Sequence, residues 1–74
     1  MNDYKRYWIA HVSSTNGFDY PIFIYGTEAD FREYCESEIG YVPRYSGATD
    51  KEVEAGKLLR MKFYLAPEAR HANG

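Results

Sequence analysis

The side chains that could carry covalent or metal chemistry are few in this sequence. It holds one cysteine, Cys35, and two histidines, His11 and His71. A thiol and an imidazole can form a nucleophile–base pair, and both residue types bind zinc. However, Cys35 falls on the apolar side of a predicted helix, where a thiol commonly acts as a small buried hydrophobic group. Three scattered residues also cannot complete a four-ligand zinc site without several carboxylates.

Other catalytic signals are missing as well. Gly56-Lys57 lacks the upstream glycine of a phosphate-binding loop. Catalysis usually needs titratable groups that converge in a concave pocket, and a chain of 74 residues rarely encloses one. We therefore predict no catalytic residue, no metal site and no cofactor, and we expect a protein that is not an enzyme.

The aromatic residues give a stronger signal. Eight tyrosines, four phenylalanines and one tryptophan stand among 74 residues. One small core cannot hide that many rings, because a domain of this size buries only about 60% of its unfolded surface. We expect part of the aromatic surface to face outward and to serve binding.

Charge and hydropathy exclude two classes of protein. Nine basic and eleven acidic residues leave a formal charge of −2, which argues against a generally cationic nucleic-acid binder. No apolar run approaches the ~20 residues that span a bilayer. Residues 1–6 lack the basic-then-apolar order of a signal peptide. We expect a cytoplasmic protein without a membrane partner.

The first half of the chain predicts a hairpin. Tyr4 to Val12 and Phe18 to Tyr25 are rich in aromatic and β-branched residues, as strands are. Between them, a polar cluster ends in Asn-Gly, which reverses the chain readily. Pro21 cannot donate a ladder hydrogen bond, so it favours a sheet edge for the second strand.

Two helices, an extended loop from Tyr41 to Gly47 between them, and a third strand follow. Thr27 to Ile39 has an N-cap residue, acidic residues in its first turn and an apolar face, with Glu38 close to that face. Thr49 and Glu52 form a capping box, which predicts a short helix to about Ala55 before Gly56. Lys57 to Leu65 reads as a strand.

These elements predict an α+β fold of order β-β-α-(short α)-β. We expect a three-stranded antiparallel sheet of spatial order 2-1-3, with one face covered by one amphipathic helix. Residues 1–66 would form a single domain, and residues 67–74 a flexible C-terminal tail. The predicted core face holds Trp8, Ala10, Val12, Phe18, Tyr20, Ile22, Ile24, Leu59, Met61, Phe63 and Leu65.

The predicted helix from Thr27 to Ile39 is a candidate binding surface. Five acidic residues and one base, Arg32, give it a charge of −4. Complementary charge speeds encounter and fixes the register of a complex. We expect Asp30, Glu33 and Glu36 to face a basic partner.

The uncovered face of the sheet is a second candidate. It would carry Tyr7, Phe23, Tyr25 and Tyr64 beside Arg60 and Lys62, and an exposed aromatic patch usually marks an interface. Aromatic rings beside basic residues could also stack the bases and bind the phosphates of a single-stranded nucleic acid. The alternative is that residues 41–56 fold over this face and cover it.

These features together favour a small non-enzymatic protein-interaction domain. Its size, aromatic content and strand–strand–helix layout are similar in style to small inhibitors from phages and mobile elements, including anti-CRISPR proteins, although no motif is shared. Such a domain would occupy a basic, nucleic-acid-handling surface of a larger partner. Single-stranded nucleic-acid binding is the alternative function. A weak homodimer through the strand from Lys57 to Leu65 is also expected, because that strand leaves an unpaired edge.

Overall fold

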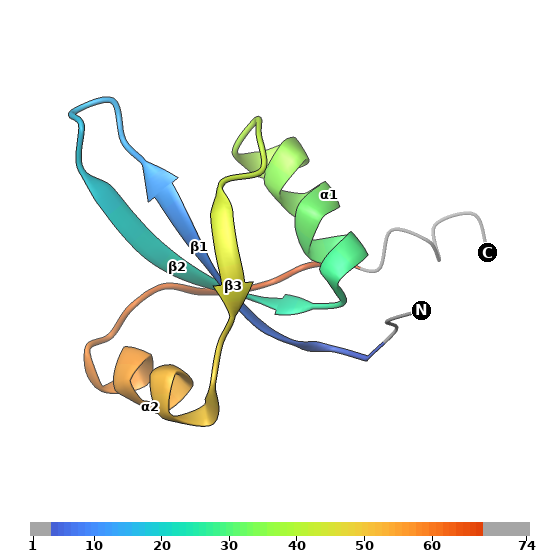
Figure 1. Ribbon diagram of the computed structural model, residues 1–74, viewed down its shortest axis with the longest axis vertical. Helices are drawn as coiled ribbons and strands as arrows, with labels where there is room; N and C mark the ends of the chain where they lie inside the picture. The colour runs from blue at the N-terminus through green and yellow to red at the C-terminus, as the bar shows by residue number, and fades with distance from the viewer. Residues whose placement is uncertain (1–3, 68–74) are drawn as a thin grey trace.

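The computed structural model describes residues 4–67, so most of the predicted tail (residues 68–74) lies outside the described residues (Figure 1). Along the chain the elements are β1 (Arg6–Ser13), β2 (Asp19–Gly26), α1 (Glu28–Glu38), β3 (Arg44–Gly47), α2 (Asp50–Leu58) and β4 (Phe63–Leu65). The predicted α+β class is confirmed.

The sheet has four strands in the order β3-β1-β2-β4. β1 pairs antiparallel with β2 and with β3, whereas β4 pairs parallel with β2. The predicted three-stranded antiparallel sheet of order 2-1-3 is therefore wrong. Its third strand, Lys57 to Leu65, is divided between the end of α2 and the short strand β4. The neighbour of β1 is instead β3, in a segment that we predicted as loop.

The β1–β2 hairpin forms as predicted. Gly17 has φ 86°, a conformation that glycine adopts without a steric penalty. The Ser14 N–H donates to the Phe18 carbonyl at 2.8 Å, and the Gly17 N–H donates to the Ser14 carbonyl at 3.1 Å. These bonds reverse the chain and set the register, in which Trp8 lies opposite Ile24 and Ala10 opposite Ile22.

Pro21 lies where its missing N–H costs nothing. The Phe23 N–H donates to the Lys62 carbonyl at 3.0 Å, and N–H groups two residues apart point to the same side of a strand. The nitrogen of Pro21 therefore also points toward the β4 side. Since β4 pairs only with residues 23–25, position 21 lies beyond the end of the ladder. The prediction that β2 is an edge strand is wrong, because β2 lies between β1 and β4. At Pro21 itself, however, one side of β2 has no neighbouring strand.

Both helices begin at the predicted caps. The Asp30 N–H donates to Thr27 Oγ1 at 3.1 Å, so α1 starts where its sequence signal stands. At α2 the capping box is complete, because the Glu52 N–H donates to Thr49 Oγ1 at 3.2 Å and the Thr49 N–H donates to Glu52 Oε1 at 2.9 Å. These caps satisfy backbone donors that a helix leaves without partners.

Gly56 does not end α2, as we predicted it would. The helix continues to Leu58, and Gly56 lies buried within it. A Cβ at this position would stand 2.6 Å from an atom of the Phe23 ring and 3.2 Å from the Phe63 ring. Glycine is needed here for the close approach of α2 to the sheet.

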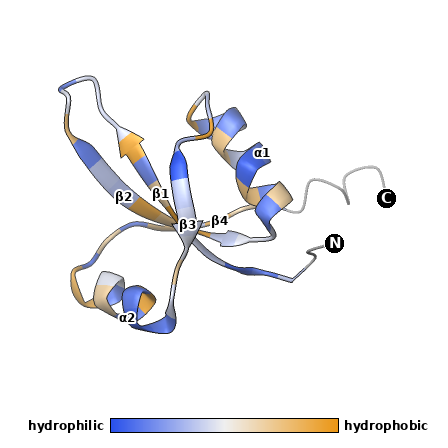
Figure 2. Cartoon of the chain, viewed as in Figure 1, coloured by the Kyte–Doolittle hydropathy of each residue, from blue (hydrophilic) through white to orange (hydrophobic). Residues whose placement is uncertain are grey.

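The two helices cover opposite faces of the sheet, which makes two cores. The α1 core contains Ala10, Val12, Ile22, Ile24, Phe31, Cys35 and Ala66. The α2 core contains Ile9, Phe23 and Ala48, packed against Tyr7, Val53, Met61 and Phe63. Figure 2 shows the apolar part of β2 in the middle of the molecule, between the helices.

The prediction that only one face of the sheet is covered is therefore wrong. The structure agrees with the alternative, in which residues 41–56 fold over the second face, and α2 forms the cover. Met61 and Phe63 belong to the α2 core. Phe18, Tyr20, Leu59 and Leu65, which we placed in the core, are exposed. Leu59 is exposed because α2 takes up the chain to Leu58, so the strand alternation that we assumed before Phe63 does not exist. Phe18 precedes the first residue of β2, and Leu65 is the last residue of the edge strand β4.

Candidate functional site

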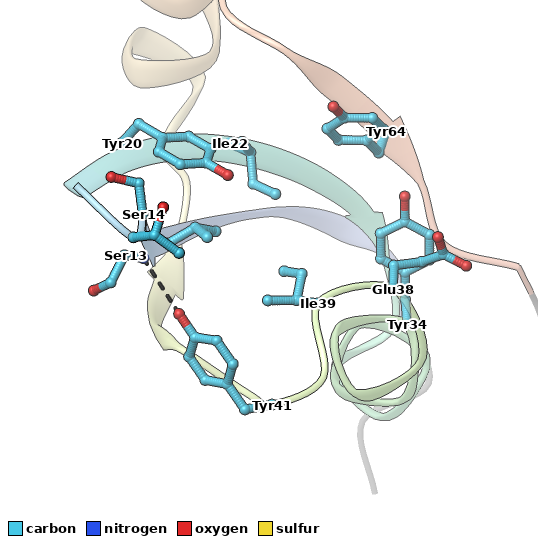
Figure 3. A pocket seen from close by; sticks show the side chains of 11 residues that line it. Ser13, Ser14, Tyr20, Ile22, Tyr34, Glu38, Ile39, Tyr41 and Tyr64 are labelled. Atoms are coloured by element: carbon cyan, nitrogen blue, oxygen red, sulfur yellow. Dashed lines mark hydrogen bonds between the residues drawn. The ribbon is translucent and has the colours of Figure 1, made fainter. Parts of the chain in front are cut away.

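A groove with four tyrosines lies between the β1–β2 hairpin and the C-terminal part of α1 (Figure 3). Its volume is about 580 Å³, within the range of about 300–1,000 Å³ for ligand pockets. We call it the tyrosine groove and define it by Tyr20, Tyr34, Glu38, Tyr41 and Tyr64. The hydroxyl-bearing residues 13–15 line it at the hairpin.

The walls of the groove come from several elements of the fold. β2 directs Tyr20 toward the same face as Ile22, since alternate residues share a face. Pairing of β4 with β2 sets Tyr64 opposite Ile24. Tyr34 and Glu38 are four residues apart on α1 and thus lie on one side of the helix. The groove therefore needs the hairpin, α1 and β4 together.

Tyr41 closes the end of the groove. Gly40 follows α1 with φ 98°, and its N–H donates to the Cys35 carbonyl at 3.0 Å, as at a glycine helix end. This turn brings Tyr41 back toward the hairpin, where its hydroxyl accepts a hydrogen bond from the Ser13 N–H at 3.2 Å. The position of Tyr41 is thus fixed by the protein itself.

The groove is both aromatic and negatively charged. The rings of Tyr34 and Tyr64 have centroids 6.3 Å apart and an interplanar angle of 36°. Burial, followed by the nearby negative charge of Glu38, raises the pKa of Tyr34. Among the described residues that line the groove there is one carboxylate, Glu38, and no lysine, arginine or histidine.

The acidic surface of α1 adjoins the groove. Glu33, Glu36 and Glu38 are exposed, and a smaller hollow lined by Glu33 shares Tyr34 and Glu38 with the tyrosine groove. Glu33 and Glu36 are thus accessible to a partner, and that they bind one stays a prediction. Asp30 is different: its side chain is only 7% exposed, beside Gly26 and Pro67, so the prediction that it lies on the open face is wrong.

The predicted aromatic face is not open. Phe23 is 3% exposed, because α2 and Phe63 pack on it; its ring stacks on Phe63 at 4.6 Å. Tyr7 and Tyr25 are half-buried and in contact, with ring centroids 4.9 Å apart. Tyr64 lies on the other face, toward α1 and Tyr34. The structure thus does not bring the four predicted aromatic residues together.

The two predicted basic residues lie outside the strands. Arg60 and Lys62 are exposed in the connection between α2 and β4, where Arg60 adopts φ 59°. We had placed both side chains on a regular strand face, and that placement is wrong because α2 extends to Leu58.

Of the five residues that define the groove, the sequence predicts only Tyr64 as a site residue and misses the other four. It places Tyr20 in the core and Tyr41 in a loop. It places Tyr34 on the apolar face of its helix, and Glu38 close to that face. The position of Glu38, four residues after Tyr34, is the signal that could have indicated a site, because it places a carboxylate beside an aromatic ring on one helix face.

The pair of residues that could have acted in catalysis is separated. Cys35 is buried in the α1 core, where burial raises its pKa to about 11. His11 is exposed and lies on the opposite face of the sheet, together with Ile9. Within residues 4–67, no group of three His, Cys, Asp or Glu side chains could hold a metal ion. Neither helix of this part of the chain is long and apolar enough to cross a membrane. Comparisons with protein-family models, curated proteins and solved structures found no match to this chain.

Proposed function

We propose that this chain is a non-enzymatic protein-interaction domain that occupies a basic surface of a larger partner. The observation that carries the proposal is the combination of the acidic surface of α1 with the adjoining tyrosine groove, whose described lining holds a carboxylate and no basic side chain. Tyrosine supplies large, rigid contact area at a low cost in conformational entropy, while the carboxylates select a basic partner.

A basic surface of matching chemistry is common on proteins that handle nucleic acids, because such proteins neutralise phosphates with lysine and arginine. A small acidic domain on that surface would exclude the nucleic acid by competition. The charge of −4 between Thr27 and Ile39 would speed the encounter with the partner, and this effect falls steeply with salt.

Single-stranded nucleic-acid binding, the alternative function, receives less support. It requires exposed rings on which bases can stack, and the platform expected for them is covered by α2, with Phe23 only 3% exposed. The accessible tyrosines of the groove stand beside Glu38, whose charge repels phosphates.

The proposal is tested by capture from a host lysate with three forms of the protein. Glu33→Lys reverses a charge on the acidic surface, and Glu54→Lys makes the same change at an exposed position of α2. We expect a partner whose recovery falls with Glu33→Lys and persists with Glu54→Lys. With the purified partner, Glu33→Lys should also lower the association rate at low salt, and the difference from the wild-type protein should shrink as salt is added.

Two results would contradict the proposal. One is equal recovery of every partner by both variants, because the acidic surface then contributes nothing specific. The other is tight binding of a labelled single-stranded oligonucleotide at low ionic strength, weakening steeply with salt, which is the behaviour of a protein that contacts phosphates.

A further inference from the structure

We infer that the tyrosine groove is a receptor for one arginine side chain of the partner. This inference rests on the proposed function and adds the chemistry of the contact. It starts from Glu38, which stands at the groove beside Tyr34 and Tyr64 (Figure 3). A carboxylate next to aromatic rings is the combination that holds a cation, because the ring faces attract positive charge and the carboxylate pairs with it.

The remaining lining fits the same ligand. Tyr41 and the hydroxyl-bearing residues 13–15 place acceptor oxygens around the space. Hydroxyl oxygens accept hydrogen bonds from the five N–H donors of a guanidinium group. With no lysine, arginine or histidine among the described lining residues, nothing in that lining repels a cation.

Arginine fits this groove better than lysine does. Its guanidinium is planar, stacks on aromatic rings and binds a carboxylate through two parallel hydrogen bonds, whereas an ammonium is a strongly hydrated point charge. The volume of about 580 Å³ also exceeds that of one side chain, so the backbone on either side of the arginine can enter. The expected ligand is an arginine in an exposed loop or chain end of the partner.

The groove exists before any ligand arrives. The Ser13 N–H holds the hydroxyl of Tyr41 at 3.2 Å, and Tyr34 and Tyr64 lie against each other at 6.3 Å. A site whose walls are already fixed loses less conformational freedom on binding. One arginine side chain can therefore contribute measurable affinity by itself.

The inference is tested by NMR titration with three capped hexapeptides that differ only in carrying arginine, lysine or glutamine at two central positions. We expect the arginine peptide to shift the resonances of the groove residues and to bind more tightly than the lysine peptide. Glu38→Gln should weaken arginine-peptide binding about tenfold, because it removes a charged hydrogen bond. The variant should fold, since a negative charge near the C-terminus of a helix is unfavourable.

Two comparison variants separate the groove from general charge effects. Glu54→Gln, on α2, should leave the affinity unchanged, and Glu36→Gln should lower it about twofold through screened long-range attraction alone. Equal losses with Glu36→Gln and Glu38→Gln would overturn the groove as the receptor and leave the acidic surface of α1 as the binding element. Equal affinity for the arginine and lysine peptides, or no shifts at millimolar peptide, would also overturn the inference. The proposed function itself is tested separately, by the capture from a host lysate with Glu33→Lys and Glu54→Lys.

Discussion

Replacing Gly56 with alanine should destabilise the protein, although the same change usually stabilises a helix. Alanine is favoured over glycine within a helix by about 1 kcal/mol. At this position, however, the added Cβ would stand 2.6 Å from Cε1 and 2.8 Å from Cζ of Phe23. Ordinary contacts of this kind begin at 3.4 Å, so the ring or α2 must move by about 0.8 Å, the difference between 3.4 and 2.6 Å.

The surroundings make this movement costly. Phe23 is 3% exposed, and its ring stacks on Phe63 at 4.6 Å and meets Tyr7 edge-on at 6.5 Å. Overpacking of a filled core costs about 1–3 kcal/mol. Subtracting the gain of about 1 kcal/mol in helix propensity leaves a net loss of up to about 2 kcal/mol. That loss is a large part of the roughly 3–5 kcal/mol that a core of this size supplies.

Urea denaturation followed by the fluorescence of Trp8, the single tryptophan, measures the effect. Trp8 stacks on Phe31 in the other half of the molecule, so its signal reports global unfolding. Ala55→Gly, at an exposed position of α2, is the control for helix propensity and should cost about 1 kcal/mol. Adding Phe23→Leu to Gly56→Ala should cost less than the sum of the two single changes, because the smaller side chain makes room.

A stabilising effect of Gly56→Ala would refute the reasoning. It would mean that helix propensity decides the outcome and that α2 does not press on Phe23.

Two further predictions concern the buried thiol and the sheet edge. Burial raises the pKa of Cys35 from 9.0 to about 11, so the stability that comes from keeping this thiol protonated is complete below pH 9 and is lost as the pH rises toward 11. Native iodoacetamide labelling at pH 8 should therefore proceed only as fast as the protein unfolds, and rapid labelling would contradict the packing of the α1 core. Self-association through β4 should be weak, since three residues form a short edge. Sedimentation equilibrium over a hundredfold concentration range measures it. A mass that stays constant near 8.6 kDa would show that the edge does not pair.

The parts of the fold that the sequence predicts correctly depend on local interactions. The Asn-Gly turn, the Thr27 cap and the Thr49–Glu52 capping box each act within five residues, so their residue types suffice to place them. The start of α1 and α2 and the β1–β2 hairpin follow from these signals.

The parts that could not be predicted depend on distant partners. β3 and β4 have four and three residues, too few to show periodicity, and each is a strand only because β1 or β2 supplies its hydrogen bonds. Gly56 reads locally as a helix stop and is instead a contact with Phe23, 33 positions earlier in the sequence. The tyrosine groove joins the hairpin, α1 and β4, so its residues could not be grouped before the strand order was known.

The two cores also determine how the register of β2 is specified. In a sheet with one solvent face, a slip of one residue exchanges apolar and polar side chains, and polarity alone prevents it. Ile22, Phe23 and Ile24 are all buried, so a slip here would exchange one apolar residue for another. The sizes of the side chains must therefore specify the register of β2. Of these three residues, only Phe23 meets the space left by the absent side chain of Gly56, which it shares with the ring of Phe63. This fit of the largest of the three side chains against the smallest residue favours a single alignment of the strand.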